Sequence, residues 1–165
     1  AVYVSKEAQG AKAQLLGSSS INDANHISGP SRTGEGLYLS VQNALDEAKI
    51  NPKQIDLINA HGTATLYNDE MESIAFMRAN LLSTPLNSYK GYFGHTLGTS
   101  GLLETLLTIE LAHYKTLLKS LNFETIGVSH PINILRETKN QEVNYILKTA
   151  SGFGGSNTAL VIKQL

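Results

Sequence analysis

The chain has 165 residues, of which 41% are hydrophobic and 16% charged, and this composition is typical of one globular domain with a core of its own. Its net charge of −1 argues against a nucleic-acid-binding surface, and no apolar run approaches the roughly 20 residues that span a bilayer. Cysteine is absent, which excludes disulfides, thiolate metal sites and an intrinsic thiol nucleophile.

The first residues read as the end of a β-strand. The chain opens Ala1-Val2-Tyr3-Val4-Ser5 without a methionine, whereas natural domains more often begin with polar, frayed residues. We therefore expect residues 1–165 to be one excised domain. A strand is expected over residues 13–20, and a loop rich in Gly, Pro, Ser and Asn over residues 21–34.

Strand and helix then alternate. Residues 35–49 have the periodicity of an amphipathic helix, and Asn51-Pro52 ends it. The apolar run at 55–60 predicts a buried strand, and Asn68 or Asp69 is expected to cap a second helix that reaches residue 80.

The second half of the chain continues this pattern. A short strand is expected at 86–88, followed by a helix from 98 to 114. That helix carries leucines around most of its circumference, which predicts burial on several sides. Two late strands, 144–150 and 158–164, are joined by the glycine-rich segment 152–157 and predict a hairpin.

These elements predict an α/β fold: a mainly parallel, mixed sheet with an antiparallel edge strand and helices on its faces. In open α/β sheets, ligands bind at the loops after the carboxyl ends of the strands. Those loops are residues 61–65, 89–95 and 152–157, and all three carry glycine and polar side chains. We expect them to converge, so that His61, His95 and Phe153 lie at one edge and the two histidines can share a ligand oxygen.

Each histidine, taken alone, is more typical of a structural role. His61 follows a buried strand, and His95 lies at the start of the apolar helix. A helix N-terminus disfavours an imidazolium, so His95 is expected to be neutral and able to donate a hydrogen bond to a developing oxyanion.

Lys90 and Glu104 are expected to pair. Glu104 is the only charge on its helix before Glu110, and a buried carboxylate requires a partner. A purely structural ion pair is the alternative. The other histidines, His26, His113 and His130, are interpreted as structural, and no metal site is expected because no pair has the spacing of helical ligands.

Four motifs in register resemble the elongating β-ketoacyl-acyl-carrier-protein synthases, which are condensing enzymes of the thiolase fold. They are Asn59-Ala60-His61-Gly62-Thr63-Ala64-Thr65 with Asn68-Asp69; Lys90 with Gly94-His95-Thr96-Leu97-Gly98; Gly101 with Glu104; and Gly152-Phe153-Gly154-Gly155-Ser156-Asn157. The match covers essentially the whole chain.

The resemblance implies that the chain is the C-terminal half of such a synthase, and that residues 1–5 are a remnant of the last strand of the N-terminal half. In the family that half carries the nucleophilic cysteine, so this chain alone is expected to be inactive in condensation. The implied reaction is a decarboxylative Claisen condensation of an acyl thioester with malonyl-acyl carrier protein, in fatty acid or polyketide biosynthesis.

The resemblance also implies roles for individual residues. His61 and His95 would stabilise the enolate formed as the malonyl group loses CO2, and Lys90 with Glu104 would fix the local field and geometry. Thr63 and Thr65 would bond the phosphopantetheine arm of the carrier protein, and Phe153 would gate the acyl pocket. The chain has Thr149-Ala150-Ser151 where the family often has Asn-Ser-Phe, which leaves the acyl chain length open.

Partners and location follow from the same resemblance. We expect acyl carrier protein and the N-terminal half as partners, a homodimer when complete, no cofactor besides the carrier's phosphopantetheine, and a cytoplasmic location. Two other interpretations stay open: a natural non-catalytic partner subunit that binds acyl carrier protein, and an unrelated α/β binding module. Keeping both His61 and His95 argues against the cysteine-free chain-length factors, which usually lose these histidines.

Overall fold

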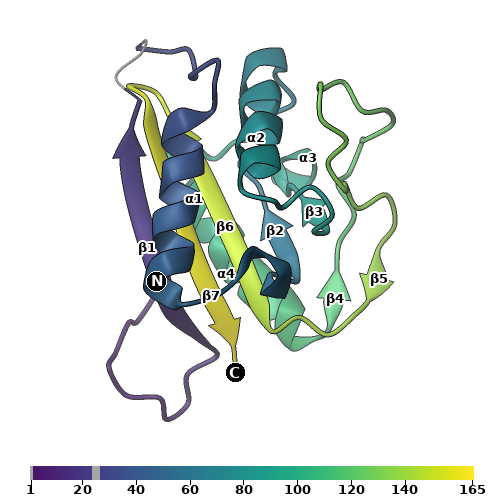
Figure 1. Cartoon of the computed structure of the whole chain (residues 1–165). Helices are drawn as coiled ribbons and strands as arrows, with labels where there is room; N and C mark the ends of the chain where they lie inside the picture. The colour runs from purple at the N-terminus through teal and green to yellow at the C-terminus, as the bar shows by residue number, and fades with distance from the viewer. Residues whose placement is uncertain (1, 24–26) are drawn as a thin grey trace.

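A five-stranded mixed sheet forms the centre of the computed structural model, which describes residues 2–23 and 27–165 (Figure 1). Ala1 and residues 24–26, including His26, lie outside the described residues. In spatial order the strands are β1 (Ala13–Asn22), β7 (Ser156–Gln164), β6 (Tyr145–Gly152), β2 (Leu57–Asn59) and β3 (Leu86–Asn87). The pairs β1–β7 and β7–β6 are antiparallel, whereas β6–β2 and β2–β3 are parallel. The predicted mixed α/β fold is confirmed, but its antiparallel part is larger than one edge strand because the hairpin places β7 between β1 and β6.

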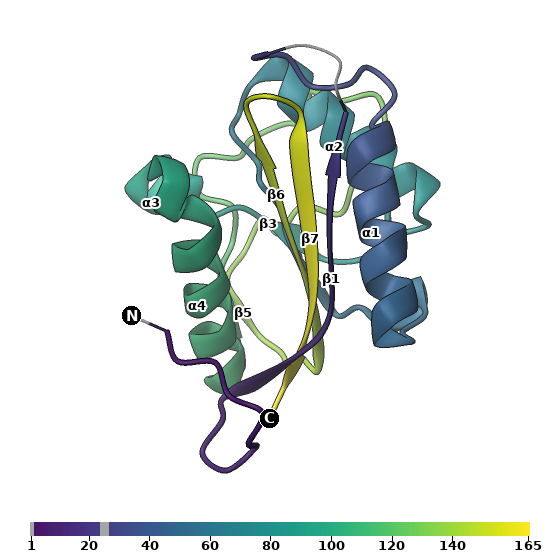
Figure 2. The ribbon, with the colours of Figure 1, turned by 90° about the vertical axis from the view of Figure 1, so that its left-hand side faces the viewer.

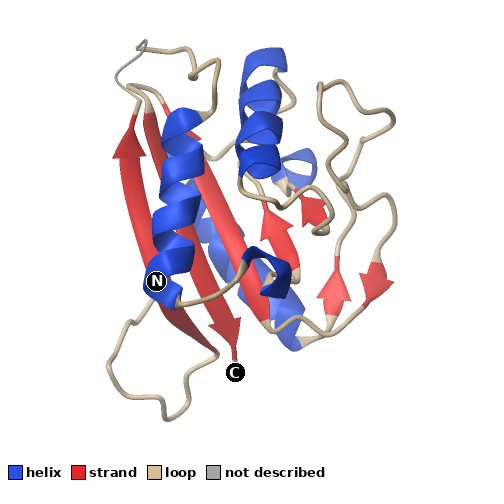
Figure 3. Cartoon of the chain, viewed as in Figure 1, coloured by secondary structure: helices blue, strands red, loops and turns tan. Residues whose placement is uncertain are grey.

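Helices cover both faces of this sheet. Helices α1 (Glu35–Ala48) and α2 (Leu66–Arg78) lie on one face, and α4 (Ser100–His113) lies on the other (Figure 2). Figure 3 also shows the short elements: α3 (Lys90–Phe93), 3-10 turns at Pro52–Gln54 and Leu97–Thr99, and a small antiparallel sheet of β4 (Thr116–Leu117) and β5 (Lys139–Asn140). No helix within the described ranges is long and apolar enough to cross a membrane.

The larger core lies between the sheet and the α1–α2 face. Its members are apolar side chains that are almost completely buried, among them Leu37, Val41, Ala44, Leu45, Ile58, Met71, Ala75, Phe76, Leu147 and Val161. Helix α1 packs against β1 so closely that a Cβ on Gly17 would lie 2.2 Å from the backbone oxygen of Ala44. A glycine is therefore required where the two elements cross.

Helix α4 buries a polar stripe, contrary to the expectation of burial on several sides. Its buried residues recur every four positions and face the sheet: Ser100, Glu104, Thr108 and Ala112. Leu102, Leu103 and Leu106 are between 37% and 50% exposed. The apolar residues outnumber the polar ones, but the charged partners of Glu104 lie on the sheet side and determine which face of the helix is buried.

The structure differs in detail from three further expectations. Residues 2–5 form no strand. Helix α2 begins at Leu66 after Thr65, and Asn68 lies within it and donates to Glu72 instead of capping. The segment 89–95 contains the single helical turn α3. That residues 1–5 belong to an N-terminal half stays a prediction.

Candidate active site

His61 lies directly after β2, and the backbone on either side of it is held by a buried carboxylate. The backbone N–H groups of His61 and Gly62 donate to the two carboxylate oxygens of Glu72, over 2.9 and 2.7 Å. Gly62 has φ 45° in the left-handed region, and a Cβ there would lie 2.6 Å from the Cβ of Ser88. Only glycine therefore allows the chain to turn at this point and bring His61 inward, where it is 6% exposed.

His95 is brought to His61 by the segment between α3 and α4. Gly94, with φ 76°, precedes it, and the backbone N–H of Leu97 donates to Nδ1 of His95 over 3.0 Å. Because Nδ1 accepts a hydrogen bond, the proton of the neutral ring lies on Nε2. The ring centroids of His61 and His95 are 5.2 Å apart, with an interplanar angle of 81°. The predicted convergence of these two histidines is confirmed.

The imidazole of His61 is neutral over the physiological range. Burial is the main cause that lowers its pKa to about 3, and the positive charges of Lys90 and Lys148 lower it further. Glu104 opposes these effects without reversing them. A neutral ring has one N–H donor and one acceptor nitrogen, as the expected oxyanion contact requires.

Glu104 forms the predicted pair with Lys90 and a second pair that the sequence analysis missed. Lys90 Nζ lies 2.5 Å from Oε1 of Glu104, and Lys148 Nζ lies 2.5 Å from Oε2. Ser100 Oγ also donates to Oε1, over 2.8 Å. Burial raises the pKa of Glu104, but the two lysines outweigh burial and hold that pKa below its ordinary value.

Glu72 is a second buried carboxylate that the sequence analysis missed. Besides the two backbone N–H groups, it accepts from the amide of Asn68 over 2.9 Å and from the hydroxyl of Thr149 over 3.3 Å. Burial raises the pKa of Glu72, whereas these donors favour its ionised form. The sequence could have indicated Glu72, because this residue lies on the buried face of α2, one turn before Phe76.

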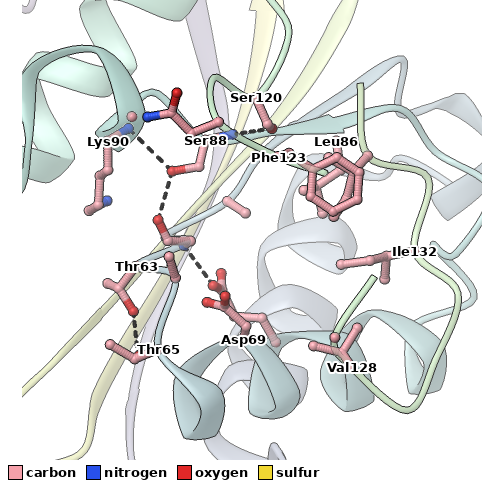
Figure 4. A pocket seen from close by; sticks show the side chains of 18 of the residues that line it. Thr63, Thr65, Asp69, Leu86, Ser88, Lys90, Ser120, Phe123, Val128 and Ile132 are labelled. Atoms are coloured by element: carbon pink, nitrogen blue, oxygen red, sulfur yellow. Dashed lines mark hydrogen bonds between the residues drawn. The ribbon is translucent and has the colours of Figure 1, made fainter. Parts of the chain in front are cut away.

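Thr63 and Thr65 lie beside a cavity of about 630 Å³, and their hydroxyls are joined by a 2.7 Å hydrogen bond. Figure 4 shows these threonines and Lys90 on one side of the cavity, with the apolar side chains of Phe123 and Ile132 on the other. A cavity of this size with a polar and an apolar wall is typical of small-molecule sites.

Phe153 lies in the turn between β6 and β7, past the carboxyl end of β6. Because β6 runs parallel to β2, this turn and His61 lie at the same edge of the sheet, as expected. The ring is 84% exposed and makes no ring contact with either histidine in the described part of the chain. A role for Phe153 as a gate stays a prediction.

No cluster of three or more His, Asp or Glu side chains suited to a metal ion occurs among residues 2–23 and 27–165. Two close imidazoles lie at this edge of the sheet. They are supported by two buried carboxylates and two buried ammonium groups.

Comparison with known proteins identifies the family. A family model described as "Beta-ketoacyl synthase, C-terminal domain" matches residues 12–124. The chain is 32% identical over 164 residues to 3-oxoacyl-[acyl-carrier-protein] synthase 2 of Rhizobium meliloti (strain 1021), covering 95% of this chain and 38% of that protein.

Solved structures show the same fold. One match is a chain in the structure of a type II polyketide acyl-carrier protein with its ketosynthase bound to the hexaketide. Its TM-score is 0.89 at 26% identity, covering 95% of this chain and 40% of that one. Another is from the Xenorhabdus doucetiae ketosynthase in complex with its chain length factor, with TM-score 0.86 at 33% identity, covering 94% and 40%.

The fold is that of the ketosynthases, a thiolase-like fold. The chain belongs to the beta-ketoacyl synthase family, in which it corresponds to the C-terminal domain. It spans about two fifths of the length of the relatives and structures that it matches.

Proposed function

We propose that this chain provides the two-histidine part of the active site of a 3-oxoacyl-[acyl-carrier-protein] synthase. The observation that carries the proposal is the edge-to-face pair of His61 and His95. His95 has its ring proton on Nε2, and Nδ1 of His61 is buried without a partner among the described residues. A buried polar atom left open in this way is typical of a site that a ligand completes.

The chemistry follows from where charge develops. As the malonyl group loses CO2, the C–C bond to its carboxylate breaks and the electron pair moves to the thioester oxygen, giving an enolate. Two neutral N–H donors stabilise that oxygen without a proton transfer. The enolate carbon then attacks an acyl thioester, whose thiolate leaves. Because the chain contains no cysteine, a cysteine thiolate has to come from sequence outside these 165 residues.

The remaining residues support this reaction in distinct ways. Lys90 and Glu104 hold the segment that carries His61, and Thr63 and Thr65 bond the phosphopantetheine arm at the cavity. Phe153 gates the acyl pocket from the same edge of the sheet. Acyl carrier protein is the proposed substrate carrier, since a structural relative is a ketosynthase in complex with one. The homodimer, the N-terminal half and the cytoplasmic location stay predictions.

Mass spectrometry of the carrier protein tests the proposed reaction. The complete synthase that contains this chain is expected to convert acyl and malonyl carriers into 3-oxoacyl carrier, and the 165-residue chain alone is expected to form none. His61→Gln and His95→Gln should each abolish the product in the complete protein, whereas His113→Gln at the exposed end of α4 should not. Carrier binding without product formation would instead identify a non-catalytic partner subunit.

A further inference from the structure

Glu104 is shared by two lysines that come from different elements. Lys90 lies on α3 and Lys148 on β6, and each occupies one carboxylate oxygen at 2.5 Å. The side chains of Lys148 and Glu104 are 2% and 0% exposed. A structural ion pair needs only one lysine, so the second buried ammonium calls for an explanation of its own.

The same two lysines reach consecutive backbone carbonyls at His61. Lys90 Nζ donates to the oxygen of His61, and Lys148 Nζ lies 3.5 Å from the oxygen of Ala60. On the other side, Glu72 accepts from the N–H groups of His61 and Gly62. The backbone around His61 is therefore held by cations at its carbonyls and by a carboxylate at its amides.

Strand β6 contacts both buried carboxylates, Glu104 from one face of the sheet and Glu72 from the other. Side chains alternate along a strand, so Lys148 and Thr149 point to opposite sides of the sheet. Lys148 reaches Glu104 on the α4 side, and Thr149 reaches Glu72 on the α2 side. One short stretch of β6 thus fixes both groups that hold the His61 segment.

We propose that Lys148 is a positioning residue of the condensing site: with Lys90 and Glu104 it holds the Ala60–His61 backbone and keeps a positive charge beside the histidine pair. The inference rests on the proposed function and adds to it a residue outside the two-histidine, Lys90 and Glu104 set. The two lysines balance the two buried carboxylates Glu104 and Glu72 in formal charge, but at His61 the positive charges of Lys90 and Lys148 outweigh the opposing charge of Glu104 in their effect on its pKa. The positive charge of the lysines favours an oxyanion forming at His61 and His95.

Because the charge of Lys148 acts on His61, a change in that charge with pH should alter the surroundings of the His61 ring. The charged groups that act on Lys148 are Glu104 on α4, Lys90 on α3 and, from the other side of the sheet, Glu72 on α2. Burial is the main cause that lowers the pKa of Lys148, to about 8. Lys148 is therefore charged at neutral pH and loses its charge as the pH rises above about 8. The proposed stabilisation of the oxyanion should weaken in that range.

The first test follows the His61 ring by nitrogen NMR between pH 6.5 and 9.5, in the 165-residue chain at a concentration where light scattering detects no association. Wild type is expected to show a shift of the ring signals with a midpoint near that of Lys148. Lys148→Met and Lys148→Gln should both lose this titration step. The glutamine variant keeps a hydrogen bond to Glu104, so it serves as the test if Lys148→Met folds poorly. Lys148→Arg should move the step beyond the range. Lys12→Met, which removes an exposed lysine paired with Glu110 on the same helix, should retain it.

The second test measures malonyl-carrier decarboxylation in the complete synthase. Lys148→Met is expected to lower kcat on the order of tenfold with little change in KM, less than the roughly hundredfold or larger loss caused by removing a direct oxyanion donor. Lys148→Arg should restore most of the rate and extend activity to higher pH.

Failure of the proposed function and failure of the Lys148 proposal give different experimental results. A wild-type synthase without decarboxylation overturns the proposed function, and the NMR result still decides whether Lys148 acts on His61. The proposal for Lys148 is overturned if the His61 signals are flat over this range, or if the step persists in Lys148→Met or Lys148→Gln. An unchanged rate and pH profile in an active Lys148→Met synthase would also overturn it.

Discussion

The rings of His61 and His95 lie edge to face with their centroids 5.2 Å apart, although one follows β2 and the other precedes α4. Two separate backbone features produce this contact. Gly62 turns the chain after β2, and the Leu97 N–H fixes the ring of His95. The pair is thus set by backbone geometry around each histidine, which leaves the side chains available for a ligand.

The buried neutral state of His61 predicts a specific loss of stability in acid. The unfolded chain takes up a proton on this histidine below about pH 6.5, whereas the folded chain does so only near its lowered pKa of about 3. The unfolded state therefore binds more protons between these values, and stability falls as the pH falls. The expected contribution is about 1.4 kcal/mol for each pH unit in that interval.

Urea unfolding of wild type and His61→Gln between pH 4 and pH 7 measures this contribution. The free energy of unfolding of wild type should decrease relative to the variant as the pH is lowered. A difference that is independent of pH would show that the folded state protonates His61 as readily as the unfolded state does.

Removing Glu104 should impair stability and activity together. Glu104→Ala leaves two buried ammonium groups without their carboxylate, and loss of one partner of a buried charge pair costs about 3–5 kcal/mol. Thermal and urea unfolding measure the loss, and Glu104→Gln, which keeps the shape, should fold better. Glu110→Ala removes an exposed carboxylate of the same helix and serves as the control. Full activity and unchanged stability of Glu104→Ala would show that the cluster is incidental.

The exposed leucines of α4 should drive association of the isolated chain. Leu102, Leu103 and Leu106 lie on the helix face away from the sheet, and full burial of one leucine is worth roughly 1.5–3 kcal/mol. Several such residues together are rarely left uncovered on a monomer. Light scattering should therefore detect dimers or larger species, and Leu103→Gln with Leu106→Gln should reduce them. A clean wild-type monomer at high concentration that binds no hydrophobic dye would contradict this expectation.

The sequence predicts the site better than it predicts the packing of α4. The histidines could be placed together because loops after parallel strands share one edge of a sheet. Glu104 could be paired with Lys90 because a lone carboxylate on an apolar helix requires a cation. Which face of α4 is buried depends on Lys148, which comes from β6 and is remote in sequence. The pattern of leucines along α4 therefore could not predict which face of the helix is buried.

Lys148 and Glu72 were missed although each left a local signal. Lys148 directly follows the apolar residues Ile146 and Leu147 in the central strand β6, much as Glu104 lies among the leucines of its helix. Glu72 lies on the buried face of α2, one turn before Phe76. In both cases the partners, a helix carboxylate and two backbone amides, are identifiable only once the chain is folded. The single turn α3 is too short for periodicity to predict.

Release of CO2 from malonyl-acyl carrier protein by the complete synthase tests the central claim most directly. If His61 and His95 both donate to the enolate oxygen, His61→Gln and His95→Gln should each lower kcat by about a hundredfold or more, with little change in KM for the carrier. The double variant should lose no less than either single one. Decarboxylation at the wild-type rate in either single variant would contradict the assignment of this histidine pair as the oxyanion site.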